Sequence, residues 1–237
     1  MKLAIMQPYF LPYIGYFQLL ASVDQFIVYD NIKYTRKGWI KRNRMLLNGT
    51  DVMFSLPLKK GSDSLDVAQR ELAADFDRTK LLNQFKGAYG RAPQFELTYP
   101  VLERIVHHED ANLFRYIHHS ILLLCEHLGI KTEIRISSEI AIDHELKGQD
   151  KVLALCKAAG ADTYINTIGG VELYAKDDFR IQGIDLQFIK VRPFEYAQFG
   201  ATFVPWLSIV DMLMFNPLDA VRDCIETNYD LSPALEI

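Results

Sequence analysis

The chain has 237 residues, of which 49% are hydrophobic and 24% charged, and a formal net charge of −4. It is long enough to bury a full core, and its balance is that of an ordinary soluble protein. The negative charge argues against a nucleic-acid partner. No uncharged apolar stretch reaches the roughly 18 residues that cross a membrane, and the N-terminus lacks a signal-peptide core. We therefore expect a cytoplasmic location.

The first thirty residues predict a strand, a loop, a helix and a second strand. Leu3 to Met6 is short and apolar, the prolines at 8 and 12 forbid regular structure between them, and the segment from Gly15 to Ala21 is apolar at helical spacing. Asp24 to Asp30 then has the β-branched and aromatic residues of a strand. In open α/β sheets ligands bind at the carboxyl ends of the strands, so the loop from residue 7 to residue 15 is a candidate ligand loop.

A cationic segment follows the second strand. Residues 31 to 50 contain six basic residues and no acidic one, with two aromatic residues between them, and they predict a loop at the same edge of the sheet as the first loop. Arginines there could hold a phosphate or a carboxylate bidentately. A solvated basic loop is the alternative interpretation.

The middle third predicts more helix than strand. Val52 to Leu58 and Val67 to Phe76 are predicted as strands, and Asp77 to Tyr89 as a helix. A long central helix is expected from about Asp110 to Leu128, with Gly129 ending it.

Strands and helices alternate again in the last third. Lys131 to Ser137, Thr163 to Asn166 and Asp185 to Val191 are predicted as strands, in that order along the chain. A helix from Asp150 to Ala159 separates the first two, with Asp150 as its N-cap. Ser208 and Asp211 have the spacing of a capping box, so they are as well explained by helix capping as by function.

These elements predict an α/β fold: a mostly parallel sheet of Rossmann-like type with helical insertions in the middle third. We expect one domain over residues 1–237, with a mainly helical subregion at about 77–130.

Metal and cysteine chemistry are not indicated. Neighbouring histidines such as His118 and His119 point about 100° apart on a helix, so they cannot share an ion from one helix face. His144 is better explained as a solvated loop residue than as a ligand. The three cysteines have no metal-type spacing and lie in apolar surroundings, which is typical of buried, reduced thiols. We predict no metal and no cofactor.

The first loop is neither a Walker A motif nor a dinucleotide fingerprint. Its core, Pro12-Tyr13-Ile14-Gly15-Tyr16, distantly resembles the nucleotidyltransferase superfamily, which has a His-x-Gly-His sequence at this point, over the helix N-terminus that binds nucleotide phosphates. Tyr13 and Tyr16 would stand where the histidines stand, and tyrosine cannot supply imidazolium charge. A simple aromatic cluster is the alternative explanation for these rings.

A closer resemblance covers nearly the whole chain. Several sequence segments resemble, in the same order, those of the WbqC-like family. They are Met6 to Phe10, Pro12 to Gln18, Gly38 to Arg44, Leu128 to Thr132 with Ser137-Ser138, and Phe203 to Leu213. That resemblance implies a role in building bacterial O-antigen or other surface polysaccharides, as a transferase of an acyl or amino-acyl group such as glycine onto a nucleotide sugar or glycan precursor. Asn166 to Gly170 departs from the glycine-richer form expected there, which leaves a role for Asn166 open.

Residues and resemblance together predict a cleft for a phosphate-bearing small molecule, either a nucleotide sugar or an activated acyl donor. Asp30 is the candidate general base, with His144 and Asp211 as weaker candidates. A non-catalytic nucleotide- or carbohydrate-binding protein of the same pathway is the alternative function. The predicted ligand-binding residues are Gln7, Tyr9, Tyr13, Gly15, Tyr16, Lys37, Trp39, Arg42, Asn43 and Arg44.

Overall fold

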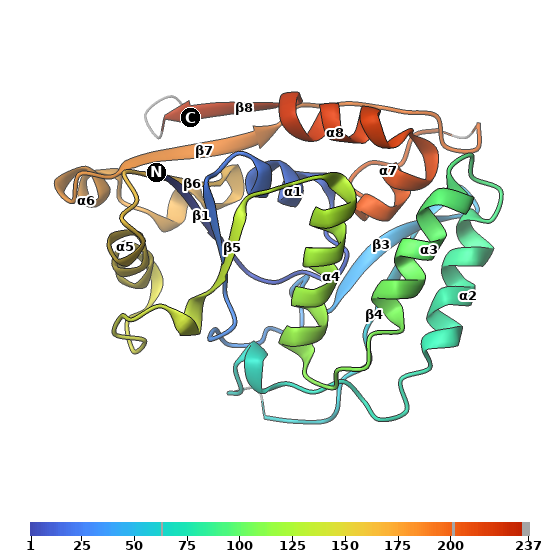
Figure 1. The fold of residues 1–237 in the computed structure, drawn as a ribbon, viewed down its shortest axis with the longest axis horizontal. Coiled ribbons are helices and arrows are strands. Elements are labelled where there is room, and N and C mark those ends of the chain that lie inside the picture. The colour runs from blue at the N-terminus through green and yellow to red at the C-terminus, as the bar shows by residue number, and fades with distance from the viewer. Residues whose placement is uncertain (63, 201, 234–237) are drawn as a thin grey trace.

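The computed structural model describes residues 1–62, 64–200 and 202–233. A six-stranded sheet in the order β5-β2-β1-β6-β7-β8 forms the left half of the molecule in Figure 1. All neighbouring strands are parallel except β7 and β8, which run antiparallel. The predicted α/β class with a mostly parallel, Rossmann-like sheet is therefore confirmed. The strands are β1 (Lys2–Met6), β2 (Gln25–Val28), β5 (Glu133–Ile136), β6 (Thr163–Thr167), β7 (Asp185–Val191) and β8 (Tyr229–Pro233).

Helices cover both faces of this sheet because its strands alternate their side chains between two apolar cores. In β1, Ala4 faces the core formed with α1 (Ile14–Ala21), α7 (Ile209–Phe215) and α8 (Leu218–Thr227). Leu3 and Ile5 face the opposite core, formed with α5 (Gly148–Ala159) and α6 (Lys176–Ile181).

The strand order reverses at β1. The chain runs from β1 through α1 to β2 on one side, continues outward to β5, and later returns to place β6 on the other side of β1. Such a switch point opens a crevice at the carboxyl ends of the strands, because the connections leave in opposite directions.

A hairpin and three helices form the other half of the molecule (Figure 1). The hairpin pairs β3 (Arg42–Leu47) with β4 (Thr50–Ser55) through the turn at Asn48 and Gly49, both at positive φ. The helices are α2 (Arg78–Tyr89), α3 (Phe95–Val106) and α4 (Leu113–Leu128). The prediction of a loop through the basic segment was wrong for its second half: residues 42–47 form β3, because Met45 and Leu46 are buried against the helices.

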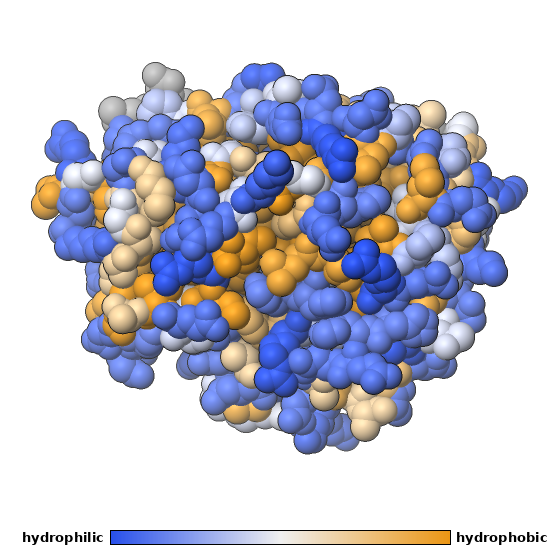
Figure 2. Space-filling view, viewed as in Figure 1, coloured by the Kyte–Doolittle hydropathy of each residue, from blue (hydrophilic) through white to orange (hydrophobic). Residues whose placement is uncertain are grey.

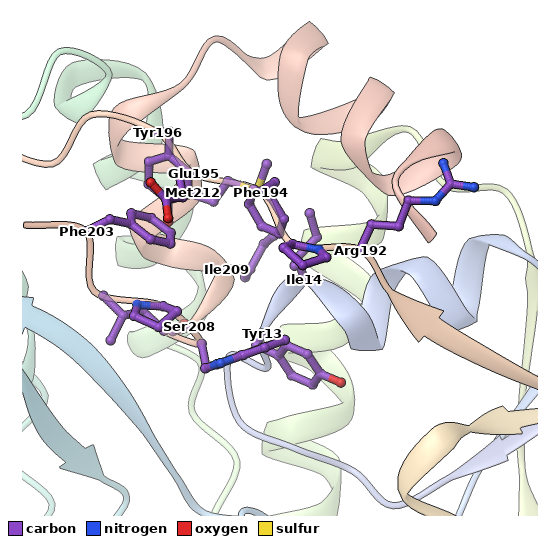
Figure 3. A pocket seen from close by; sticks show the side chains of 14 residues that line it. Tyr13, Ile14, Arg192, Phe194, Glu195, Tyr196, Phe203, Ser208, Ile209 and Met212 are labelled. Atoms are coloured by element: carbon purple, nitrogen blue, oxygen red, sulfur yellow. The ribbon is translucent and has the colours of Figure 1, made fainter. Parts of the chain in front are cut away.

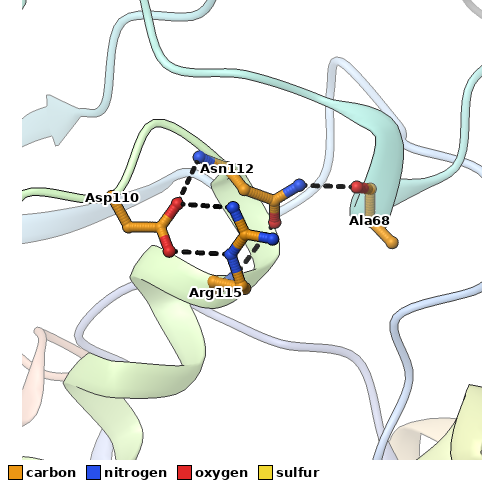
Figure 4. A network of polar contacts seen from close by, with 4 residues as sticks. All are labelled: Ala68, Asp110, Asn112 and Arg115. Carbon is orange, nitrogen blue, oxygen red and sulfur yellow. Dashed lines mark hydrogen bonds and ion pairs between the residues drawn. The ribbon is translucent and has the colours of Figure 1, made fainter.

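The central helix α4 begins at Leu113, three residues later than predicted, because Asn112 caps it. The Asn112 Oδ1 accepts the backbone N–H of Arg115 at 3.0 Å, and its Nδ2 donates to the Ala68 carbonyl at 2.6 Å (Figure 4). Arg115 also forms an ion pair with Asp110 at 2.7 Å. Gly129 ends the helix in the left-handed region, as predicted.

Two local predictions were wrong. Residues 67–76 do not form a strand: Val67–Gln69 is a 3-10 helix, η1, whose Asp66 and Gln69 bond reciprocally as a capping box. Helix α5 starts at Gly148 rather than after Asp150, so Asp150 lies in the first turn and Lys147 occupies the N-cap. Two further 3-10 helices are η2 (Ser137–Glu139) and η3 (Ile168–Leu173).

The capping-box interpretation holds for Ser208 but fails for Asp211. The Ser208 side chain caps α7 by accepting from the Val210 N–H. The Asp211 carboxylate is fully buried and accepts from Tyr89 Oη at 2.9 Å, Tyr196 Oη at 2.7 Å and Gln198 Nε2 at 2.6 Å. Its partners come from distant parts of the chain, so it joins α2, α7 and the segment before α7.

Apolar side chains gather at the centre of the face shown in Figure 2, where the surface is hollowed, and hydrophilic residues surround them. Among the described residues, no helix combines the length and the apolar character needed to cross a bilayer.

Candidate functional site: the cleft at the switch point

A cavity of about 850 Å³ lies where the strand order reverses. It is lined by residues that follow the carboxyl ends of β1, β2 and β6, together with the first turn of α5. We call it the switch-point cleft. Its polar lining residues are Gln7, Tyr9, Tyr29, Asn31, Lys33, Asp66, His144, Glu145, Lys147, Gln149, Lys151, Asn166, Thr167 and Tyr174.

Asn31 is the centre of a hydrogen-bonded group in this cleft. Its Oδ1 accepts from the Lys151 ammonium at 3.2 Å, and the same ammonium donates to the Asn31 carbonyl at 3.1 Å. Because an ammonium only donates, the amide nitrogen of Asn31 must face the other way, where it lies 2.9 Å from His144 Nδ1. His144 Nδ1 is then the acceptor, so a neutral His144 carries its proton on Nε2.

Lys151 is unusually buried for a lysine, with 6% of its surface exposed. Burial lowers the pKa of its ammonium, while Asp66 and Asp30 act in the opposite direction. Helix α5 places it here because Lys151 follows the N-cap Lys147 by four residues, one turn into the helix. The amine is thus presented to the cleft by a rigid element.

Asp30 lies behind this group and does not line the cleft. The residue is 6% exposed; its Oδ1 accepts from Ser137 Oγ at 2.7 Å and from the Ser138 N–H at 3.0 Å, and its Oδ2 accepts from Ser138 Oγ at 2.6 Å. The carboxylate therefore fastens the end of β2 to η2. Ser137 also lies 2.8 Å from Asn31 Oδ1, so the Asp30 network touches the Asn31 group at one point.

The ligand-binding residues predicted in the first loop line two different cavities or lie in neither. Gln7 and Tyr9 line the switch-point cleft, whereas Tyr13 lines a second pocket described below. A Cβ added to Gly15 would lie 2.5 Å from the ring of Tyr13, so this ring covers the first turn of α1. Tyr16 is 2% exposed, and its ring packs against Phe26 with the ring centroids 5.4 Å apart.

The basic segment meets the first loop through its backbone and Asn43, not through its charges. Asn43 Nδ2 donates to the Leu11 carbonyl at 2.8 Å. Arg42 bonds to the carbonyls of Gly38 and Lys37, and Arg44 pairs with Asp51 at 3.1 Å.

Both guanidinium groups, those of Arg42 and Arg44, lie within 5.7 Å of the Trp39 ring centroid. Neither arginine lines the switch-point cleft, and neither do Lys37 and Trp39.

The second pocket, of about 190 Å³, lies between the start of α1 and the segments around α7 (Figure 3). Its walls are mostly aromatic and apolar side chains: Tyr13, Ile14, Phe194, Tyr196, Phe203, Trp206, Ile209 and Met212. We call it the aromatic pocket.

Comparison with known proteins places the sequence in a family. The family model described as "WbqC-like protein family" matches residues 7–223, which include most of the cleft lining, the aromatic pocket and four of the six strands of the sheet; β1 and β8 lie outside the match. This chain belongs to the WbqC-like protein family.

A curated relative supports the assignment. The chain is 29% identical over 222 residues to "Uncharacterized protein Rv1507c" of Mycobacterium tuberculosis (strain ATCC 25618 / H37Rv), covering 90% of this chain and 92% of that protein. No solved structure matches the chain. Among the described residues of this WbqC-like protein, no three His, Cys, Asp or Glu side chains are grouped as they would be to hold a metal ion.

Sequence reasoning missed most of the WbqC-like cleft. Asn31, Lys151 and Tyr174 were not singled out, and His144 was a weaker candidate for the general base that was better explained as a solvated loop residue. Lys151 offered one signal, because it precedes the apolar Leu155 by four residues and so lies on the same face of α5. The contact between Asn31 and His144 joins residues 113 apart in sequence and had no local signal.

Proposed function

We propose that the protein is a transferase of bacterial surface-polysaccharide biosynthesis that moves an acyl or amino-acyl group onto a nucleotide sugar or glycan precursor. The switch-point cleft carries this proposal, because it combines a lining suited to sugars and phosphates with a buried amine and an imidazole. The pathway is the one that the family resemblance implies.

The polar lining fits a sugar. Sugar hydroxyls donate and accept hydrogen bonds at the same time, and Gln7, Asn166 and Thr167 offer both kinds of group at the ends of β1 and β6. Asn166 Nδ2 donates to Tyr174 Oη at 3.1 Å, and its Oδ1 accepts the Thr167 N–H, so its orientation is fixed.

The cleft also supports phosphate binding. Lys33 and Lys147 supply positive charge, and the first turn of the 12-residue helix α5, at Gly148 and Gln149, borders the same cavity. In this proposal these features take the place of the phosphate site predicted at Gly15. Gly15 lies in the first turn of α1, which the ring of Tyr13 covers.

An acyl transfer also needs a proton donor for the developing oxyanion or leaving group and an acceptor for the attacking hydroxyl or amine. We assign the donor role to the Nε2–H of His144, whose tautomer Asn31 fixes, with the Lys151 ammonium as a second donor. The assignment of Asp30 as base stays a prediction. General-base catalysis typically raises the rate about 10²–10⁴-fold. If Asp30→Asn lowers turnover by less than about tenfold, Asp30 is therefore not the base.

The test is a ligand screen followed by product analysis. Thermal-shift measurements with nucleotide sugars, coenzyme A esters and aminoacyl-adenylate analogues find the ligands, and mass spectrometry of the mixtures that bind finds a product. A ligand at about 100 times its Kd stabilises the fold by about 2.7 kcal/mol, which is readily measured. Lys151→Met should abolish this stabilisation, whereas Lys157→Met, an exposed lysine on the same helix, should leave it intact.

A non-catalytic carbohydrate- or nucleotide-binding protein is the second candidate, because both carboxylate oxygens of Asp30 are already hydrogen-bonded. Stabilisation that depends on Lys151, with no product from any donor and acceptor pair, would favour it over the transferase. Equal stabilisation of the Lys151 and Lys157 variants would refute the cleft as the site.

A further inference from the structure

We infer that the aromatic pocket is a second ligand site, which takes an apolar acyl or aryl group of about six carbon atoms. The pocket is concave, and one wall is Trp206, an aromatic side chain that is 56% exposed. Exposed aromatic surface at the mouth of a cavity is typical of recognition sites.

Backbone strain is concentrated around this pocket. Among the described residues, the non-glycine residues at positive φ are Leu11, Asn48, Phe199 and Trp206. Asn48 belongs to the β3–β4 turn, where asparagine is tolerated. Leu11 and Phe199 lie in the segments that carry Tyr13 and Tyr196 to the pocket, and Trp206 lines it. Strain of this kind persists only where the surroundings enforce it, and it clusters at ligand clamps.

The surroundings of Trp206 enforce its conformation. Its carbonyl accepts from the Arg44 guanidinium at 3.1 Å, and two residues later the Ser208 N–H donates to the Arg44 carbonyl at 2.9 Å. The next N–H, of Ile209, donates to the Pro12 carbonyl at 2.8 Å. Strand β3 and the first loop thus fix the backbone at Trp206, and the Trp206 ring centroid lies 6.2 Å from that of Tyr13.

Three polar side chains that line the pocket are already paired, and most of the remaining lining is apolar, which favours an apolar occupant. Ser208 Oγ donates to the Leu11 carbonyl at 2.7 Å, and Tyr196 Oη donates to Asp211 at 2.7 Å. Arg192 pairs with Asp230, and Figure 3 shows its guanidinium turned away from the rings. A hydrocarbon group buried against the apolar walls needs no hydrogen-bond partner, whereas a polar group facing those walls would lose its hydrogen bonds to water, which is costly.

The size of the pocket limits the occupant. A cavity of about 150 Å³ in another protein binds benzene, so one of about 190 Å³ accommodates a single ring or a short acyl chain.

The aromatic pocket lies close to the switch-point cleft. Tyr9 and Tyr13 line the two cavities from one loop, four residues apart, so their Cα atoms are separated by at most about 14 Å. Resting on the proposed transferase function, this site holds the acyl part of the donor, and that part is apolar rather than glycine.

Methyl NMR tests the site directly. Met212 lines the pocket, and its methyl resonance, assigned with Met212→Leu, is followed during titration with hexanamide, benzamide and acetamide. These probes are neutral, so charge contributes nothing. We expect a saturable shift with hexanamide or benzamide and none with acetamide at equal concentration.

Variants locate the binding. Trp206→Ala, which changes an exposed side chain, should weaken hexanamide or benzamide binding at least about fivefold. Phe203→Ala, from a neighbouring wall, should do the same and serves as the second variant. Ile181→Ala removes an apolar side chain that is 74% exposed on α6, outside the pocket, and should leave binding unchanged.

The inference is overturned if neither hexanamide nor benzamide gives a saturable shift, or if the Trp206 and Phe203 variants bind as tightly as the parent chain. Neither result bears on the transferase proposal, which is read from product formation and from Lys151→Met. Conversely, a failed product screen leaves the probe titration interpretable.

Discussion

The buried carboxylate of Asp211 gives a sharp test of how the two halves of the fold are joined. Tyr89 is fully buried; its hydroxyl accepts the Leu46 N–H at 2.9 Å and donates to Asp211 at 2.9 Å. Tyr89→Phe removes this one oxygen and keeps the ring. The Leu46 N–H then loses its acceptor, and the carboxylate keeps two of its three donors.

The expected loss follows from these two bonds. An unsatisfied buried N–H costs about 1–3 kcal/mol, and a hydrogen bond to a charged group contributes about 1.5–3 kcal/mol. We therefore expect Tyr89→Phe to lower the free energy of unfolding by about 3–5 kcal/mol. For a chain of this size, about 1 kcal/mol shifts Tm by roughly 2–4 °C, so the fall in Tm should be on the order of 10 °C.

The matched control is Tyr16→Phe. Tyr16 is also buried, but its hydroxyl has no hydrogen-bond partner among the described residues. Removing an unpaired buried hydroxyl should leave stability unchanged or raise it by about 1 kcal/mol. Both variants are measured by urea unfolding with thermal unfolding alongside. Equal effects of the two substitutions would refute the reasoning, because it depends only on whether the hydroxyl is paired.

The Tyr89 effect should depend on pH. Burial raises the pKa of Asp211, while its hydrogen bonds, including that from Tyr89, lower it. With a raised folded pKa, the stability linked to Asp211 is fully present below the unfolded pKa and is lost as the pH rises through the folded pKa. Losing the Tyr89 donor raises the folded pKa further. The difference in stability between Tyr89→Phe and the parent should therefore shrink as the pH falls through the Asp211 pKa, and a constant difference would contradict this.

Three further predictions concern α2 and α4. Asn112→Ala removes the cap of α4 and the bond to Ala68, and should cost about 1–2 kcal/mol in urea unfolding. Gly87 is exposed in the interior of α2 with free space around a new Cβ, so Gly87→Ala should stabilise the fold by about 0.5–1 kcal/mol. Gly129 has a φ of 75°, so Gly129→Ala should destabilise the fold by about 1 kcal/mol. Effects of the same sign for both substitutions would contradict the backbone argument. Burial lowers the pKa of His118, so the stability linked to this residue is present above the unfolded pKa and is lost as the pH falls through the folded pKa. Between about pH 7.5 and about pH 5.5, the Tm of His118→Leu should therefore fall less than the Tm of the parent chain.

Local patterns predicted the elements that carry strong periodic or capping signals. Strand β7 matches its prediction at both ends, and α2 begins after Asp77, whose side chain accepts the Lys80 N–H. The parallel sheet followed from the alternation of strands and helices, because parallel strands need crossover connections. The strand predicted at 67–76 failed because its contacts are isolated bridges to distant residues, such as Glu71 with Asn112, which no local pattern encodes.

The same distinction between local and long-range signals holds for the residues of the site. Gln7 and Tyr9 could be placed at the cleft because they follow β1 directly, and the carboxyl end of a parallel strand is a general feature of the fold class. The group around Asn31 could not be placed, because its partners Lys151 and His144 come from segments more than 100 residues away.

The sequence by itself determined the fold class, the position of the first loop at a strand end and the family of the protein, because these depend on periodicity and on long shared words. The tertiary structure decided which polar residues share a cavity. It bonded the predicted base Asp30 to two serines and brought Lys151, Asn31 and His144 together. It also bonded Arg42 to the Gly38 carbonyl, and Arg44 to Asp51 and the Trp206 carbonyl. Side-chain pairing of this kind depends on long-range packing, and local sequence signals do not encode it.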